Sequence, residues 1–191
     1  MTSLLRTELE VSVDSLGLEA DRHSGGVRHY RFDLNDAQHR ERWRTEIGPY
    51  DVIVFAEVLE HLYTAPELIL SFLKELLTPT GVLVVQTPNA VALRKRARML
   101  LGLHPFERIR ADRDNPGHFR EYTRSELQGI LLQAGFTIDG VWVKYYFDAR
   151  YSRHDTGNEP ARPIDGAIRN ALYRLLPGSF QEGITIVARK A

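Results

Sequence analysis

The chain contains no cysteine, which excludes disulfide bonds, thiolate metal sites and a cysteine nucleophile. It also lacks an excess of charge of either sign, because 25 basic residues balance 25 acidic ones. This balance gives no general attraction to nucleic acid, and no specific nucleic-acid partner is expected. The sequence has neither an apolar stretch of signal-peptide type at its start nor a run of the roughly 18 apolar residues that a membrane span requires. We therefore predict a cytoplasmic protein.

Glycine is present, but never in the pattern G-x-G, and the one adjacent pair, Gly25-Gly26, precedes a predicted strand instead of following one. A nicotinamide-dependent oxidoreductase is disfavoured, because the G-x-G-x-x-G loop is missing and no tyrosine–lysine catalytic pair is evident.

What the chain does have is enough apolar material for a core. With 191 residues, 43% of them hydrophobic, it is expected to form a single domain over residues 1–191. The polar stretch 151–163 predicts a mobile loop within it.

Apolar periodicity predicts an alternation of strands and helices. The run at 51–55 is unbroken and β-branched, which predicts a strand covered on both faces at the sheet centre. Thr64 and Thr123 are expected N-caps, and a turn is expected at 78–81. Together the elements predict an α/β fold whose sheet is mainly parallel with an antiparallel C-terminal edge. The predicted strands are 9–13, 27–32, 51–55, 82–86, 136–147 and 184–189, and the predicted helices are 65–77, 91–101, 125–134 and 164–176.

Three segments in order resemble class I S-adenosylmethionine-dependent methyltransferases. They are YDVIVFAEVLEHL at 50–62, LLTPTGVLVVQTPN at 76–89 and GHFREYTRSELQGILLQAGF at 117–136. The resemblance covers roughly residues 8–147, and GITIVARKA is similar to the last strand of that fold. It implies a Rossmann-like methyltransferase fold and S-adenosylmethionine as the cofactor.

The same resemblance implies that the family's first strand, its glycine loop and the following helix are lacking, so that the domain is incomplete at its N-terminus. Three explanations stand side by side: a truncated sequence, which we favour, a degenerate member without cofactor, or a partner chain that supplies the missing part. A strand left without its neighbour would expose an apolar edge, which a second copy in a homodimer or a partner chain could cover.

Cofactor contacts are implied at the carboxyl ends of strands, where open α/β sheets bind ligands. Asp14 would hold the ribose hydroxyls, Asp33 and Leu34 the adenine, and Ala56 and Glu57 the methionine part. The alternatives are that Asp14 begins a turn and that Asp33 caps a short helix.

The E-x-x-E-H segment carries the candidate chemistry. If the chain turns helically after the fourth strand, Glu57, Glu60 and His61 share one face, and His118 is a fourth candidate ligand. This set is similar to that of ubiquinone-pathway and small-RNA 2′-O-methyltransferases and implies Mg²⁺, Mn²⁺ or another divalent cation. The alternative is an acceptor pocket without metal, in which His61 is the candidate general base; Glu60 is the second candidate catalytic residue.

The preferred function is methylation of an oxygen on a small-molecule or glycan-like acceptor, and the alternative is a catalytically inactive methyltransferase-like protein. A basic amphipathic stretch at 93–103 is either a solvated face or a weak contact with a membrane or an anionic group.

Overall fold

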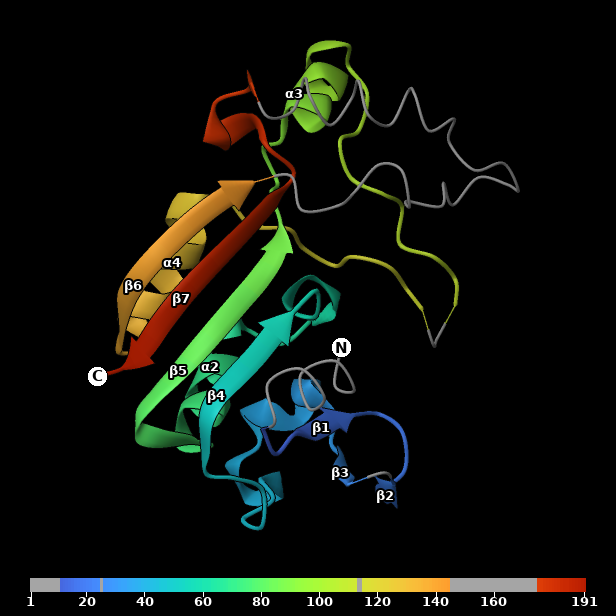
Figure 1. Cartoon of the computed structure of the whole chain (residues 1–191). Coiled ribbons are helices and arrows are strands. Elements are labelled where there is room, and N and C mark those ends of the chain that lie inside the picture. The colour runs from blue at the N-terminus through green and yellow to red at the C-terminus, as the bar shows by residue number, and fades with distance from the viewer. Residues whose placement is uncertain (1–10, 25, 113–114, 145–174) are drawn as a thin grey trace.

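The computed structural model describes residues 11–24, 26–112, 115–144 and 175–191 (Figure 1). The loop predicted at 151–163 and almost all of the helix predicted at 164–176 lie outside the described residues.

The main sheet has four strands in the order β4-β5-β7-β6. β4 (Tyr50–Ala56) and β5 (Leu77–Pro88) run parallel, whereas β7 (Gly183–Lys190) lies antiparallel between β5 and β6 (Phe136–Lys144). The strand–helix–strand unit through α2 (Pro66–Glu75) and the antiparallel C-terminal strand are therefore confirmed. α2 and α4 (Arg124–Gln133) lie behind this sheet in Figure 1, and α3 (Leu93–Leu100) stands beyond the carboxyl end of β5.

A second, small sheet has the order β1-β3-β2, with β1 (Asp14–Gly17) parallel to β3 (Val27–Arg31) and β2 (Arg22–Ser24) antiparallel to β3. The strand predicted at 9–13 is wrong over its described residues, 11–13, because pairing with β3 begins only at Asp14. That register packs Leu16 against the core and leaves Val11 46% exposed. The bounds of β1 therefore depend on its pairing with β3 and not on the local alternation of apolar residues.

β4 has the predicted position but not the predicted surroundings. Among the described strands it pairs with β5 alone, as expected for a strand that has no neighbour on its other side. Phe55 is buried, whereas Val52 and Val54 on the opposite face are 56% and 44% exposed. The interpretation of a strand covered on both faces at the sheet centre is therefore wrong for the described chain.

Helix ends follow local capping only in part. At α4, Thr123 Oγ1 accepts from the N–H of Glu126, whose carboxylate reaches back to the N–H of Thr123, so the predicted capping box is confirmed. At α2 the predicted cap is wrong: Ala65 is the N-cap residue, and Thr64 Oγ1 instead donates to the carbonyl of Asn35 at 2.8 Å. A tertiary hydrogen bond has replaced the local one.

A short helical turn after β3 contributes to the scaffold of the site. η1 (Leu34–Gln38) follows β3, and the Asn35 side chain accepts from the N–H groups of Tyr63 and Thr64, at 3.0 and 3.2 Å. The segment predicted as a turn at 78–81 is an irregularity inside β5, because Leu77 faces Tyr50 and Val82 already faces Val52. No helix within the described ranges is long and apolar enough to cross a membrane.

The core lies between the main sheet and its two helices. Most of its fully buried side chains come from α2, α4, β5 and β7, and the Phe72 ring of α2 also stacks on Phe32 with centroids 4.7 Å apart. Burying side chains of this size contributes about 1.5–3 kcal/mol each before the entropy of ordering is counted. Fully buried members are Leu59, Ile69, Leu70, Phe72, Leu83, Val85, Leu127, Leu131, Ile184 and Ile186.

Candidate active site

The candidate site begins where β4 ends. The N–H of Glu57 still donates to the carbonyl of Gln86 on β5, at 2.9 Å, and Glu57 itself has φ 54°. A left-handed conformation costs a non-glycine residue of order 1–3 kcal/mol and recurs at functional sites. The short helix η3 (Leu59–His61) starts only after this turn, so the prediction that Glu57, Glu60 and His61 share a helical face is wrong.

Glu60 is a fully buried carboxyl group at 0% exposure. Its Oε2 accepts a hydrogen bond from Thr87 Oγ1 at 2.9 Å, whereas its Oε1 is buried without a partner among the described residues. Burial, with a smaller contribution from the negative charge of Glu57, raises the pKa of Glu60 to about 7. A buried acceptor atom without a partner indicates room for a proton, a cation or a ligand group.

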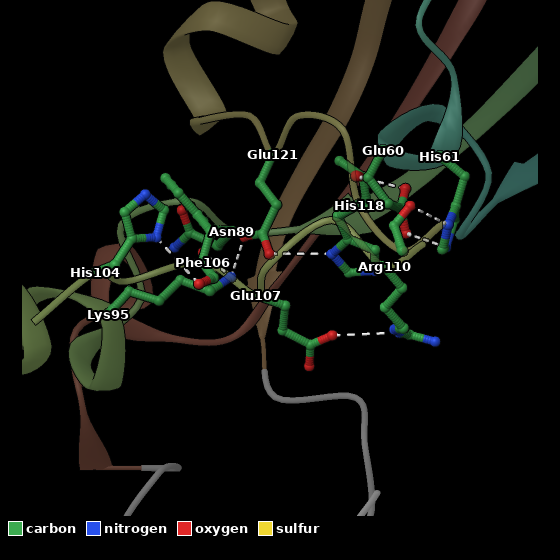
Figure 2. Close-up of polar contacts among 12 residues, drawn as sticks. Glu60, His61, Asn89, Lys95, His104, Phe106, Glu107, Arg110, His118 and Glu121 are labelled. Atoms are coloured by element: carbon green, nitrogen blue, oxygen red, sulfur yellow. Dashed lines mark hydrogen bonds and ion pairs between the residues drawn. The ribbon is translucent and has the colours of Figure 1, made fainter. Parts of the chain in front are cut away.

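His61 and His118 complete the cluster, which we call the EHH cluster: Glu60, His61 and His118 (Figure 2). One ligand atom from each of the three lies within 4.8 Å of the others, and the two imidazole rings meet edge to face with centroids 4.7 Å apart. His61 Nε2 lies 4.0 Å from the orphaned Oε1 of Glu60.

The partners of the two rings define which nitrogen carries the proton. His61 Nδ1 lies 3.0 Å from the carbonyl of Gly117, and His118 Nδ1 lies 3.1 Å from Glu121 Oε1. A carbonyl or carboxylate oxygen accepts, so each Nδ1 is the donor and each neutral ring keeps the lone pair on Nε2. This is the orientation that ligating or proton-accepting histidines require.

Tertiary hydrogen bonds bring the loop of His118 to η3. The N–H of Phe119 donates to the carbonyl of Glu60 at 2.8 Å, and the N–H of Ala90 donates to the carbonyl of Tyr122 at 2.9 Å. Gly117 has φ 88°, which favours glycine at the bend before His118. The sequence-predicted residues Glu60, His61 and His118 are therefore brought together, whereas Glu57 is not one of the clustered groups.

Two residues of the surroundings were missed by sequence reasoning. Lys95 of α3 is 5% exposed, forms an ion pair with Glu121 and donates to the carbonyl of Asn89 at 2.9 Å. Glu121 thus joins Lys95 to His118 (Figure 2). Nothing in the local sequence marks this lysine among its basic neighbours, because only the packing of α3 decides which of them is buried.

Asn89 has a structural role here. Its Nδ2 donates to the carbonyl of Gln181 at 2.8 Å, and its Oδ1 accepts from the N–H of Val91 at 3.2 Å. The side chain is 1% exposed and spans the end of β5 and the start of β7. Both ends of the side-chain amide are therefore engaged by backbone groups.

Replacing Glu121 with alanine is expected to lower the free energy of unfolding by about 3–5 kcal/mol, because it leaves the buried Lys95 ammonium without its carboxylate. Urea denaturation at pH 7 measures this loss. The matched control is Glu107→Ala, since the Glu107–Arg110 pair is exposed and is expected to contribute about 0.5 kcal/mol or less. Equal losses in the two variants would contradict the buried ion pair.

The electrostatics of the EHH cluster separate its two imidazoles. Burial, and then the neighbouring His118, lowers the pKa of His61. The hydrogen bond to Glu121 raises the pKa of His118. Although burial acts in the opposite direction, His118 and Lys95 lower the pKa of Glu121 and keep it ionised. The pKa values of these two neighbouring imidazoles are therefore shifted in opposite directions, down for His61 and up for His118.

The same three groups fit a divalent cation by donor chemistry. One carboxylate oxygen and two imidazole nitrogens suit Mn²⁺ or another borderline divalent ion better than Mg²⁺, which prefers oxygen ligands, and the buried Oε1 of Glu60 has capacity left to coordinate one. Protonation of His118 competes with such binding, because a ligand must offer its lone pair.

Asp14 does not lie at a strand's carboxyl end, so that prediction is wrong. Asp14 is the first residue of β1 and pairs with Arg28 of the parallel strand β3. Asp33 follows the end of β3, five residues after Arg28, which corresponds to roughly 16 Å along the strand direction. Asp14 therefore lies toward the amino end of the small sheet. The Asp14 carboxylate accepts from the Tyr50 hydroxyl at 2.9 Å. The proposed ribose contact of Asp14 has no support in this geometry.

Asp33, Leu34, Ala56 and Glu57 do lie at or just beyond the carboxyl ends of β3 and β4. Asp33 Oδ1 accepts from the N–H of Asn35 at 2.9 Å, which confirms capping as one role of this carboxylate. Because Asn35 in turn binds the backbone of residues 63–64, η1 is held against the loop that follows η3.

A family model described as a methyltransferase domain matches residues 7–141, and the chain therefore belongs to this family. Solved structures of methyltransferases share its fold. A putative methyltransferase from Bacillus halodurans aligns with a TM-score of 0.54 at 14% identity, over 93% of this chain and 82% of that one.

An S-adenosylmethionine-dependent methyltransferase from Thermotoga maritima aligns with a TM-score of 0.54 at 12% identity, over 100% of this chain and 78% of that one. A third, from Mesorhizobium loti, gives 0.51 at 14% identity over 93% and 90%. None of the curated proteins matches the sequence. The Rossmann-like methyltransferase fold predicted from the sequence is confirmed.

Proposed function

We propose that the chain is an S-adenosylmethionine-dependent methyltransferase that methylates an oxygen of a small-molecule or glycan-like acceptor. The observation that carries the proposal is His61: its pKa is lowered, its Nδ1 is committed to Gly117, and its Nε2 faces the buried, orphaned oxygen of Glu60. A neutral imidazole so oriented can take a proton from a hydroxyl group near neutral pH.

In this proposal the three residues of the EHH cluster have separate roles in methyl transfer. His61 Nε2 accepts the hydroxyl proton as the acceptor oxygen forms its bond to the methyl carbon. Glu60 stabilises the imidazolium that results, and His118, held by Glu121, orients the acceptor oxygen. When bound, S-adenosylmethionine supplies an electrophilic methyl group on a sulfonium and leaves as S-adenosylhomocysteine. Asp33 and Leu34 would hold its adenine, and Ala56 and Glu57 its methionine part.

A divalent cation at the EHH cluster is the second form of the same proposal. In that form the two Nε2 atoms and Glu60 Oε1 would hold the cation, which would polarise the acceptor hydroxyl. The two forms differ in their response to added Mg²⁺, which makes them separable.

Isothermal titration of the chain with S-adenosylhomocysteine, with and without Mg²⁺, tests the proposal. We expect micromolar binding, weakened about tenfold or more in Asp33→Ala and unchanged in the control Asp139→Ala, whose exposed carboxylate pairs with Arg189 on the far strands. Absence of binding by a folded chain would contradict the proposal and favour the inactive methyltransferase-like protein.

Methyl transfer to a panel of hydroxyl acceptors, measured with and without EDTA, distinguishes the two forms of the proposal, whereas binding of the cofactor product does not. Methyl transfer that survives EDTA assigns His61 as the base, whereas transfer that is lost in EDTA and restored by Mg²⁺ assigns the cation.

A further inference from the structure

α3 is an amphipathic helix whose apolar side chains are exposed and whose buried side chain is charged. Its one buried residue is the cation Lys95, which is fixed by Glu121 and by the carbonyl of Asn89. Met99 and Leu100, in contrast, are 62% and 88% exposed. Apolar side chains on a soluble helix normally turn toward the core, so this arrangement needs another explanation.

The exposed apolar residues continue past the helix. Leu101 and Leu103 follow at 75% and 50% exposure, and Phe106 and Ile109 are also exposed. In Figure 1 this segment stands clear of the main sheet, beyond the carboxyl end of β5, and away from α2 and α4. We call residues 93–110 the α3 surface. Exposed apolar side chains gathered in one segment in this way indicate an interaction site.

The charge of the α3 surface is of one sign over most of its length. Arg94, Arg96 and Arg98 are exposed on the helix, Arg108 and Arg110 are exposed in the loop after it, and no aspartate or glutamate occurs between Glu75 and Glu107. The chain as a whole is neutral, so this is a local concentration of positive charge. Its partner must be anionic as well as able to take up aliphatic side chains.

From these observations we infer that the α3 surface docks on an anionic phospholipid bilayer. Met99, Leu100, Leu101 and Leu103 enter the boundary between headgroups and acyl chains, while the arginine stems lie beside them and their guanidinium groups reach lipid phosphates. A second copy of the chain does not fit equally well, because two α3 surfaces would bring like charges together. The inference concerns where the protein binds and holds whether or not it transfers methyl groups.

Co-sedimentation with vesicles tests this inference on the full chain. The probes are vesicles of phosphatidylcholine alone and of phosphatidylcholine with phosphatidylglycerol, at low and high salt. We expect binding to the anionic vesicles that weakens with salt, and little binding to the neutral ones. Each arginine near an anionic surface contributes about a fivefold increase in partitioning, so R94Q/R96Q/R98Q is expected to lose about a hundredfold.

The apolar contribution is tested by L100S/L101S. Both side chains are exposed, so the fold is retained, and partitioning is expected to fall tenfold or more. Matched controls are Leu132→Ser and Arg124→Gln on α4, which are exposed on another side of the sheet and should leave partitioning unchanged.

Two results would overturn the inference. One is a folded chain that does not sediment with anionic vesicles, or that sediments equally well in the α3 variants and in the α4 controls. The other is light scattering that shows a dimer which L100S/L101S dissociates, since the α3 surface would then belong to a second copy.

Discussion

The variant His61→Gln is expected to transfer methyl groups about 10²- to 10⁴-fold more slowly than the unaltered chain, the contribution usual for a positioned general base. Glutamine is a polar residue of similar size, but it has no nitrogen that accepts a proton at neutral pH. Release of S-adenosylhomocysteine in the presence of a panel of hydroxyl acceptors measures the rate.

The pH profile separates catalysis from structure. Because the pKa of His61 is lowered, the rate of the unaltered chain should rise with pH to a plateau, with its midpoint below the ordinary imidazole value. This limb should be absent in His61→Gln, while binding of S-adenosylhomocysteine is retained. The control is His104→Gln, an exposed histidine in the loop after α3. A rate unchanged in His61→Gln, or an equal loss in His104→Gln, would count against His61 as the base.

The second large effect is on stability and concerns Glu60. Its folded pKa of about 7 lies above the value of 4.5 for an unburied carboxyl, so the folded chain holds this proton more tightly than the unfolded chain. Below pH 4.5 both states are protonated and the shift has no effect. As the pH rises from 4.5 to 7 the unfolded state releases its proton first, and the free energy of unfolding falls.

Glu60→Gln is therefore expected to be more stable than the unaltered chain by about 3 kcal/mol at pH 8 and nearly equal to it at pH 4. The amide introduced by this substitution can keep the bond from Thr87 without carrying a charge, which isolates the titration. Urea denaturation at pH 4, 6 and 8 gives the free energies. Glu107→Gln, an exposed control, should show no such dependence. Parallel pH curves for the unaltered chain and Glu60→Gln would contradict the burial of an ionisable Glu60.

A bound divalent cation would reverse the sign of this comparison. With Mg²⁺ at saturation, the unaltered chain gains binding free energy that Glu60→Gln lacks, so its stability at pH 8 should rise relative to the variant. This readout does not require an acceptor.

The strong local patterns predicted the elements well. β4, β7, the helices α2 and α4, and the capping box at Thr123 lie within two residues of where apolar periodicity and capping rules put them, whereas β5 begins five residues before its predicted start, at Leu77. The predictions failed where a distant segment intervened. β1 was displaced by its pairing with β3, and Thr64 was drawn away from α2 by Asn35.

The site divides in the same way. Glu60, His61 and His118 were predicted because their types and spacing carry chemistry, but their meeting depends on the hydrogen bonds from Phe119 and Ala90 that no local pattern encodes. Glu57 was lost from the group because its left-handed backbone ended the expected helical turn. The roles of Lys95 and Glu121 could not be predicted from the sequence, because only packing decides which of several basic residues is buried and paired with Glu121.

By itself the sequence determined the class of fold, the family and the three side chains of the EHH cluster, because strand and helix periods and reactive residue types are local properties. Only the tertiary structure decided which carboxylate is buried with an unpaired oxygen, which imidazole has its pKa lowered and which face of α3 is left exposed. Those properties depend on desolvation and on partners from segments far apart in the chain, and both arise only when the chain packs.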